Sequence, residues 1–305
     1  MILLPENALR GSYPPAVTPF INNEVDYQSY AVLIEYLIQG GSHGIVVNGT
    51  TGEPTTLTLQ ERSNLVKLAV NTSAGRVPVV AATGSQNYQE TLQLMNAAMQ
   101  AGADAMLIVT PYFLKPPERG LIEYYVSLAG ETDLPVMIYH IPGRAGVSLP
   151  PAAIEKIASR APNLVGVKHA STDLAFVTET LARLGPDFRI FVGLEELSFP
   201  MMALGAAGLM NAAANIVPAK IAELAVASRN KDMEHAQRLH NELFELNQAI
   251  FWDTNPIPMK YMLRRLGILS NNEHRLPMMK ATPELEHRID ALLTRLELAS
   301  VIKAR

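Results

Sequence analysis

Short runs of β-branched and other apolar residues alternate with longer amphipathic segments along the first 230 residues. This alternation is typical of βα units and a parallel sheet. No Gly-rich dinucleotide fingerprint follows the first run, so the pattern favours a closed (β/α)8 TIM barrel over a doubly wound sheet. The eight expected strands lie at 15–18, 44–48, 78–83, 105–109, 135–140, 164–168, 189–192 and 208–210.

The strand signals stop after residue 230, and helical segments are expected at 232–251, 256–266 and 283–298. The last segment places apolar residues from Leu285 to Leu296 on one stripe, so it should bury that face. No linker rich in Pro, Gly or Ser precedes these segments. We therefore expect a catalytic barrel at 1–230 and a C-terminal helical extension at 231–305 packed on it.

The composition excludes several classes of function. The net charge is −4 and the Lys/Arg residues do not cluster, so neither nucleic acid nor a membrane surface is an expected partner. The absence of cysteine excludes disulfides and thiolate metal sites and suits the cytoplasm. The apolar stretch 199–217 contains Asn211 and Asn215, which favours a buried helix and strand over a membrane span. His235 and His240 lack the HExxH spacing, so no metal site is expected.

Lys168 is the most informative residue for chemistry. In a (β/α)8 barrel the active site is built where the strands end. Lys168 ends the apolar run 164–167, which would place its amine at the barrel mouth, where desolvation disfavours the charged form. Because only the neutral amine attacks a carbonyl, Lys168 is a candidate nucleophile. The alternative is a lysine that extends to solvent or pairs with a carboxylate.

Tyr139 and Arg144 follow the neighbouring run. The phenol of Tyr139 could move protons between an amine and a substrate, and the alternative is a core tyrosine bonded to a backbone carbonyl. Arg144 has the planar fork that binds a carboxylate through two hydrogen bonds. Its alternative is an exposed loop arginine without a function.

The segment from Gly49 to Gly52 follows the second run. It lacks the Lys-Ser/Thr of a phosphate loop, but its glycines allow backbone N–H groups to approach a small carboxylate beside the Thr50 and Thr51 hydroxyls. The alternative is a tight turn. At the eighth run, we expect Met210 to contact the substrate.

Glu195 and Glu196 follow the seventh run. They could contribute one carboxylate to the mouth. The alternative is an acidic pair that interacts favourably with a helix N-terminus.

Four motifs occur in a fixed order, namely GTTGE at 49–53, TPYF at 110–113, YHIPGR at 139–144 and VGVKHAS at 165–171. Together they resemble the dihydrodipicolinate synthase and N-acetylneuraminate lyase family of pyruvate-dependent class I aldolases. The likeness runs from PAVTPF at 15–20 to NPIPMKY at 255–261 and Arg275-Leu276-Pro277.

The resemblance implies roles for five residues. Lys168 matches the imine-forming lysine, Tyr139 the proton donor and acceptor, and Thr50 and Thr51 the pair that contact pyruvate and pass protons. Arg144 matches the arginine that holds aspartate semialdehyde in the synthase branch. The expected reaction is therefore the condensation of pyruvate with L-aspartate 4-semialdehyde to 4-hydroxy-tetrahydrodipicolinate, with no cofactor beyond the covalent imine.

The resemblance also implies a homotetramer, a dimer of dimers, in which Tyr112 and Phe113 occupy the cross-subunit position. Family members sensitive to lysine carry a regulatory pocket. Glu90 and Tyr112 match that pocket, whereas Arg62 stands where those members tend to have histidine.

The chain departs from the family pattern around the pocket. Phe113 replaces a second tyrosine whose hydroxyl completes a relay across the dimer. His140 replaces the usual asparagine, His169 the usual glutamate, and Leu194-Glu195 the usual pair of aspartates after Gly193. These changes leave the lysine chemistry in place and bear on the second substrate.

Three alternatives remain open at the level of sequence. A catabolic 2-oxo acid aldolase or dehydratase, acting for example on 2-keto-3-deoxy sugar acids, would use the same lysine with another acceptor. A non-catalytic barrel that binds 2-oxo acids would explain Phe113. A metal-dependent aldolase is disfavoured because the sequence shows no clear His/Asp ligand set.

Overall fold

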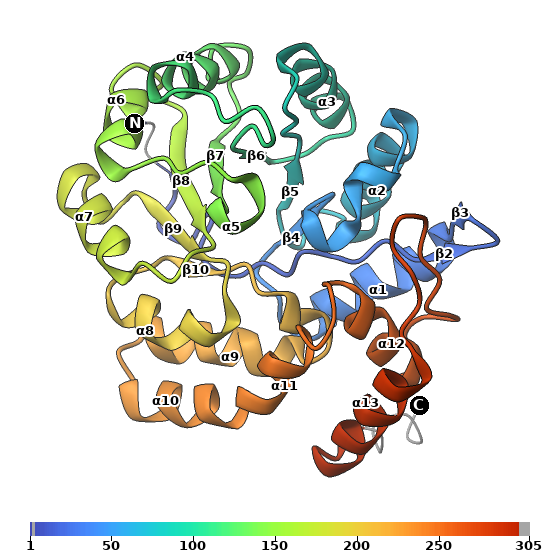
Figure 1. Ribbon diagram of the computed structural model, residues 1–305. Helices are drawn as coiled ribbons and strands as arrows, with labels where there is room; N and C mark the ends of the chain where they lie inside the picture. The colour runs from blue at the N-terminus through green and yellow to red at the C-terminus, as the bar shows by residue number, and fades with distance from the viewer. Residues whose placement is uncertain (2–3, 299–305) are drawn as a thin grey trace.

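The computed structural model describes residues 1 and 4–298. Its centre is a parallel sheet whose strands are surrounded by helices (Figure 1). The strands of this sheet are β1 (Gly11–Ser12), β4 (Ile45–Val47), β5 (Val79–Ala82), β6 (Ala105–Val109), β7 (Val136–His140), β8 (Leu164–His169), β9 (Arg189–Val192) and β10 (Gly208–Leu209).

The sheet closes on itself. Its order is β1-β10-β9-β8-β7-β6-β5-β4, and every neighbouring pair is parallel. The two edges meet where Pro15 forms a parallel bridge with Val46 and the Ala16 N–H donates to the Val46 carbonyl at 2.9 Å. The expected (β/α)8 fold is therefore confirmed. A separate antiparallel hairpin, β2 (Phe20–Ile21) with β3 (Glu24–Val25), precedes the first helix.

A helix follows each strand of the barrel and covers its outer face. The barrel helices are α1 (Tyr27–Gln39), α2 (Leu59–Ser73), α3 (Tyr88–Gln100), α4 (Glu118–Ala129), α6 (Pro151–Ala158), α7 (Leu174–Leu184), α8 (Ser198–Ala203) and α9 (Pro218–Arg229). Short helices occupy the strand ends, namely η1 (Thr50–Gly52), η2 (Pro54–Thr56), α5 (Pro142–Ala145), η3 (Glu195–Leu197) and η4 (Ala212–Asn215). A capping box of Thr58 and Glu61 begins α2.

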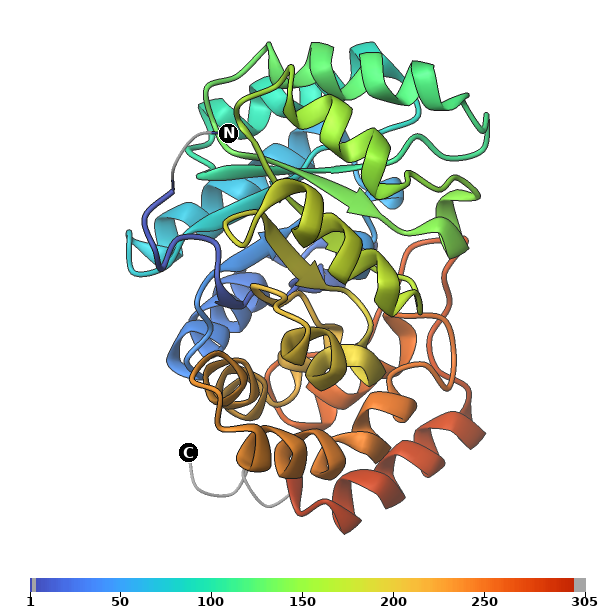
Figure 2. The same ribbon diagram turned by 90° about the vertical axis from the view of Figure 1, so that its left-hand side faces the viewer.

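Within residues 231–298, four helices follow the barrel and lie together below it in both views (Figures 1 and 2). They are α10 (Met233–Glu242), α11 (Phe244–Ala249), α12 (Ile257–Arg265) and α13 (Pro283–Arg295). Helix α13 buries Leu285, Ile289 and Leu292, as its stripe predicts. The domain boundary at residue 230 stays a prediction.

The pleat of the strands divides the core into two layers. Along β7, Met137 and Tyr139 belong to a cluster inside the barrel, whereas Val136 and Ile138 belong to the larger cluster between the sheet and the helices. Successive side chains of a strand point to opposite faces. Tyr139 therefore faces the barrel interior, and its neighbour His140 faces outward.

Two expectations about elements were wrong in detail. The first strand lies at Gly11–Ser12 instead of 15–18, because Pro14 and Pro15 lack the N–H groups that a regular ladder needs. The helix expected at 232–251 is two helices, because ψ is −8° at Leu243, far from the regular helical value. No helix among the described residues is long and apolar enough to cross a membrane.

Candidate active site

A pocket of about 290 Å³ opens at the carboxyl ends of the strands, which is the active-site face of this fold. One wall comes from the loop after β4 and another from the segments after β7. A third comes from residues of the C-terminal part of the chain, which the sequence analysis did not foresee. The lining residues that matter for chemistry are Gly49, Thr50, Glu53, Tyr112, Tyr139, Arg144 and Asn255.

Lys168 lies next to this pocket. It is aligned with Tyr139 in the register of β7 and β8, and its Nζ lies 4.3 Å from the centroid of the Tyr139 ring. The side chain is buried, with 4% of the residue exposed, and no carboxylate within the described part of the chain forms an ion pair with it. A Cβ on Gly193 would lie 3.0 Å from Lys168 Cε, so glycine there leaves room for the lysine.

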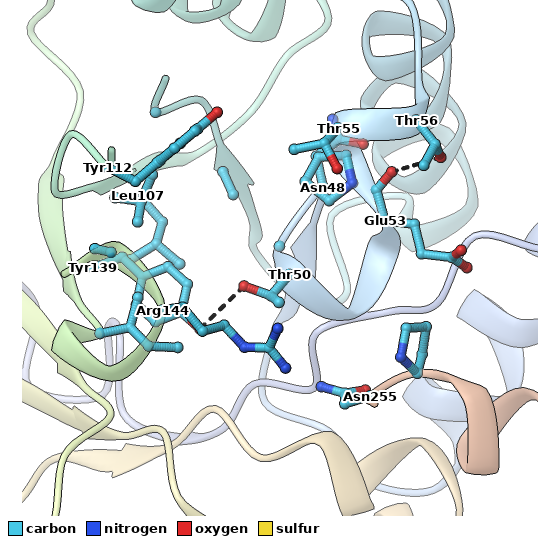
Figure 3. A pocket seen from close by; sticks show the side chains of 18 of the residues that line it. Asn48, Thr50, Glu53, Thr55, Thr56, Leu107, Tyr112, Tyr139, Arg144 and Asn255 are labelled. Atoms are coloured by element: carbon cyan, nitrogen blue, oxygen red, sulfur yellow. Dashed lines mark hydrogen bonds between the residues drawn. The ribbon is translucent and has the colours of Figure 1, made fainter. Parts of the chain in front are cut away.

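Tyr139 joins Lys168 to the pocket. Its hydroxyl lies 3.2 Å from Thr50 Oγ1, a contact that Figure 3 marks with a dashed line. Thr50 begins η1, whose Gly52 N–H donates to the Gly49 carbonyl at 2.8 Å. Two hydroxyls in contact can pass a proton between a buried amine and a bound molecule. The structure thus brings Lys168, Tyr139 and Thr50 together.

Thr51 and Met210 lie outside the pocket lining. The Thr51 hydroxyl is buried and accepts a hydrogen bond from Asn255 Nδ2 at 3.1 Å. Met210 belongs to the cluster inside the barrel that also contains Tyr139. Contacts of these two residues with a substrate stay predictions.

Arg144 provides positive charge at the pocket. It belongs to α5 and is exposed, and its side chain points across the pocket in Figure 3. None of the carboxylates in the described ranges pairs with it. A guanidinium without a partner is available to bind a carboxylate ligand.

Tyr112 and Phe113, which are adjacent in the sequence, lie in different environments. Tyr112 lines the pocket, and burial, followed by the charge of Glu90, raises the pKa of its hydroxyl, while Arg62 opposes this shift. Arg62 also lines the pocket, and burial lowers its pKa to about 10. Phe113 is 87% exposed and has a left-handed φ of 73°. Its side chain therefore faces away from the packed part of this chain.

Sequence analysis missed a buried cluster behind the threonines. Glu53 accepts a hydrogen bond from Lys260 Nζ at 2.8 Å and lies 3.0 Å from His274 Nδ1. Side-chain exposure is 0% for Lys260 and His274 and 2% for Glu53. Glu53 has a left-handed φ of 52°, a strained conformation for a residue of this kind. Its two partners, both in the C-terminal part of the chain, hold it there.

The ionisation of the cluster follows from burial and pairing. Burial alone raises the pKa of Glu53, but the hydrogen bond from His274 and the charge of Lys260 outweigh it, and the pKa lies below the usual value. Burial lowers the pKa of Lys260 to about 8, with Glu53 acting in the opposite direction. At neutral pH both groups therefore remain charged.

A second ion pair supports the same wall. Arg275 binds Glu61 of α2 at 2.7 Å and lies over the ring of Phe20 at 4.7 Å. The hydrogen bond to Glu61 raises the pKa of Arg275. The C-terminal part of the chain thus contacts the segment 49–53, which we call the threonine loop, through Asn255, Lys260 and His274. It contacts α2 through Arg275.

The carboxylate of Glu195 is buried and hydrogen-bonded and is not free at the mouth of the barrel. It is 2% exposed, and its Oε1 accepts the backbone N–H groups of Ala212 and Ala213. Burial raises its pKa, against the hydrogen bonds and the nearby charge of Lys168. The described residues contain no cluster of His, Cys, Asp and Glu that could hold a metal ion.

Comparison with known proteins identifies relatives along nearly the whole chain. The model of the dihydrodipicolinate synthetase family matches residues 8–296. The 4-hydroxy-tetrahydrodipicolinate synthase of Thermus thermophilus is 44% identical over 287 residues, which cover 94% of this chain and 96% of the relative. The enzyme of that name from Nitratidesulfovibrio vulgaris is 38% identical and covers 93% of this chain and 97% of the relative.

Solved structures agree with the sequence comparisons. Dihydrodipicolinate synthase from Aquifex aeolicus superposes with a TM-score of 0.93 at 38% identity, covering 95% of this chain and 99% of that one. The chloride-inhibited synthase from Acinetobacter baumannii, solved with pyruvate, has a TM-score of 0.92 at 33% identity and covers 97% of this chain and all of that one. Sequence, fold and site therefore agree that this chain belongs to the dihydrodipicolinate synthetase family.

Proposed function

We propose that the chain is a 4-hydroxy-tetrahydrodipicolinate synthase, which condenses pyruvate with L-aspartate 4-semialdehyde through an imine on Lys168. The placement of a buried, unpaired amine against Tyr139 carries this proposal. An ion pair would occupy the amine, whereas an amine without a carboxylate partner is available to attack a carbonyl carbon. Relatives named for this synthase support the choice of reaction.

The first step joins pyruvate to the enzyme. The lone pair of Lys168 Nζ attacks C2 of pyruvate, while the carbonyl oxygen takes a proton from the Tyr139 hydroxyl. Tyr139 recovers a proton from the attacking amine, and loss of water leaves the imine. Thr50, 3.2 Å from the Tyr139 hydroxyl, relays protons to the pocket, and Gly49 and Thr51 are the proposed contacts of the pyruvate carboxylate.

The second step forms the carbon–carbon bond. A proton leaves C3 of the imine, and the resulting enamine attacks the aldehyde carbon, whose oxygen takes up a proton. The amino group of the semialdehyde then attacks C2, closes the ring and releases Lys168. Arg144 binds the carboxylate of the semialdehyde, because it is exposed at the pocket and has no carboxylate partner in the described chain. Arg62, which also lines the pocket, is buried and donates to the Ala82 carbonyl. The imine supplies the electron sink, so the proposed reaction needs no further cofactor.

The quaternary structure and location are part of the same proposal. A homotetramer is supported by the exposed Phe113, an apolar side chain that a second copy would cover. At that position the chain offers no hydroxyl, so the proton relay consists of Tyr139 and Thr50. The cytoplasmic location expected from the sequence stays a prediction.

Borohydride trapping tests the imine. Incubation with pyruvate and borohydride should yield a covalent adduct that mass spectrometry locates on Lys168, and a chelator should not prevent it. The Lys168→Arg variant, which retains the charge but cannot form the imine, is the control. An unmodified Lys168 in the wild-type protein would exclude the mechanism.

Turnover assays test the second substrate. We expect product formation with pyruvate and aspartate semialdehyde and a negligible rate with 2-keto-3-deoxy sugar acids. The opposite preference would assign the protein to catabolic aldolases. Trapping without turnover of either substrate would favour a binding protein.

A further inference from the structure

Two buried histidines directly follow the two residues proposed to react. His140 follows Tyr139 at the end of β7, and His169 follows Lys168 at the end of β8. Both couples are in register, Tyr139 with Lys168 and His140 with His169. Because side chains alternate along a strand, the histidines lie outside the barrel wall, behind the reactive pair.

The hydrogen bonds of the two rings determine where their protons lie. The Leu149 N–H donates to His140 Nε2 at 3.2 Å, and the Ser148 hydroxyl lies 3.3 Å from the same atom. His169 Nε2 lies 3.1 Å from the Asp173 carbonyl oxygen, which can only accept. The remaining contact, between the two Nδ1 atoms at 3.0 Å, therefore has His140 as donor and His169 as acceptor.

This arrangement requires both rings to be neutral. A second proton on His140 would face the Leu149 N–H, and a second proton on His169 would face the donor of His140. Phe176 of α7 stacks on the rings, with centroids 4.0 Å from His169 and 5.0 Å from His140. The stack and the hydrogen bonds together join β7 and β8 to α7 at the level of the active site.

The surroundings favour the neutral forms. Burial is the main cause that lowers the pKa of His140 to about 4, His169 adds to the shift, and Asp173 opposes it. Burial also lowers the pKa of His169, again against Asp173. Within the described chain, the other ionisable group that acts on the two histidines is Asp173. It lies at the N-cap of α7, where its side chain accepts the Phe176 N–H.

We propose that His140 and His169 are positioning residues. The bond between their rings is a side-chain link across the ends of β7 and β8, and it fixes the spacing of the Tyr139 hydroxyl and the Lys168 amine. The link holds only while both rings are neutral. The inference rests on the proposed roles of Lys168 and Tyr139, and its test separates the two claims.

The variant His169→Phe tests the link, because it keeps an aromatic ring that can stack on Phe176 but removes the hydrogen-bond acceptor. We expect kcat at pH 8 to fall about 10- to 100-fold, as for a displaced reactive group, while the KM for pyruvate stays within about 2-fold. Pyruvate should still be trapped on Lys168 by borohydride. A wild-type kcat in this variant would overturn the positioning role, whereas failure to trap pyruvate on wild-type Lys168 would overturn the proposed function.

The variant His140→Asn tests the dependence on protonation and does not depend on the stability of the first variant. The introduced amide can donate to neutral His169 or, after rotation, accept from protonated His169, so it conserves the link. We expect kcat at pH 8 within about 3-fold of the wild type and a weaker loss of kcat as the pH falls from 6.5 towards 4, since amides do not titrate there. Circular dichroism at each pH verifies that the protein stays folded.

The control is His43→Asn. His43 accepts the Ser12 N–H before β4, at the end of the barrel opposite the pocket. The dependence of kcat on pH in His43→Asn should match that of the wild type. An acid loss of kcat in His140→Asn as steep as that of the wild type would contradict the proposal.

Discussion

Two regions of the pocket use their cationic side chains in opposite ways. On the side of β7 and β8, Lys168 and Arg144 have no carboxylate partner in the described part of the chain. On the side of the threonine loop, Lys260 pairs with Glu53 at 2.8 Å and Arg275 pairs with Glu61 at 2.7 Å. The first region leaves its amine and its guanidinium available to substrates, and the second uses its cations to hold the loop that follows β4.

The contrast is sharpest between the two lysines. Both are buried and both lie near an aromatic ring, Lys168 over Tyr139 and Lys260 over Phe20. They differ in the presence of a carboxylate. Burial of a charge is costly unless a partner compensates it, so an unpaired buried lysine is a sign of reactivity and a paired one a sign of structure.

Replacement of each lysine by methionine tests this contrast between a reactive and a structural lysine. In Lys168→Met we expect turnover of pyruvate and aspartate semialdehyde to fall by about 10⁴-fold or more, because the imine cannot form. The free energy of unfolding should fall by less than about 1 kcal/mol, because methionine keeps an unbranched apolar stem and the amine that is removed has no carboxylate partner in the described chain. Steady-state assays and urea unfolding measure the two quantities. A large loss of stability would mean that Lys168 supports the fold.

In Lys260→Met we expect the reverse. The free energy of unfolding should fall by about 3 to 5 kcal/mol, because Glu53 is left buried with a reduced set of partners. Urea unfolding is the measurement. The matched control is Lys220→Met, which removes an exposed pair with Glu242 and should cost less than about 1 kcal/mol. A second control is Lys260→Met with Glu53→Gln, which should recover part of the loss, and equal losses in all three proteins would contradict the role of the pair.

The fold and the reactive side of the pocket could be predicted from the sequence because they depend on local pattern. Alternation of apolar runs predicted the strands, and the residues at their ends are placed by the barrel itself. Lys168 follows directly from this rule, since it ends a run and lies in register with Tyr139. The motif resemblance added their roles.

The buried cluster of Glu53, Lys260 and His274, which supports the other side of the pocket, could not be predicted in this way. Glu53 and Lys260 are 207 residues apart and Glu53 and His274 are 221 apart, with no periodicity to connect them. Glu53 lies in the GTTGE motif, yet a glutamate after a glycine carries no signal of burial. The bond between His140 and His169 was missed for a related reason, since the identity of a partner across two strands depends on their register.

The arginines extend the comparison from stability to affinity. We expect Arg144→Ala to raise the KM for aspartate semialdehyde by about 10- to 100-fold, which corresponds to the loss of a charge-assisted hydrogen bond to a carboxylate. Trapping of pyruvate on Lys168 should persist. The comparison variant is Arg275→Ala, which should lower stability through the loss of Glu61 as partner. An unchanged KM in Arg144→Ala would remove the arginine from the substrate site.

The smallest expected effect is the pH dependence of the paired lysine. Burial lowers the pKa of Lys260 to about 8, whereas the unfolded chain titrates at the ordinary value of 10.5. Between these values the unfolded state binds more protons, so raising the pH favours the folded state. The stability of the wild type relative to Lys260→Met should therefore increase by about 1 kcal/mol between pH 7.5 and pH 9. Lys220→Met, which removes an exposed lysine, is the matched control, and its stability should run parallel to that of the wild type over this range. If the difference in the free energy of unfolding between the wild type and Lys260→Met does not change with pH, the pair with Glu53 compensates fully for the burial of Lys260. The contrast between a paired and an unpaired buried lysine would then be larger than the lowered pKa of Lys260 indicates.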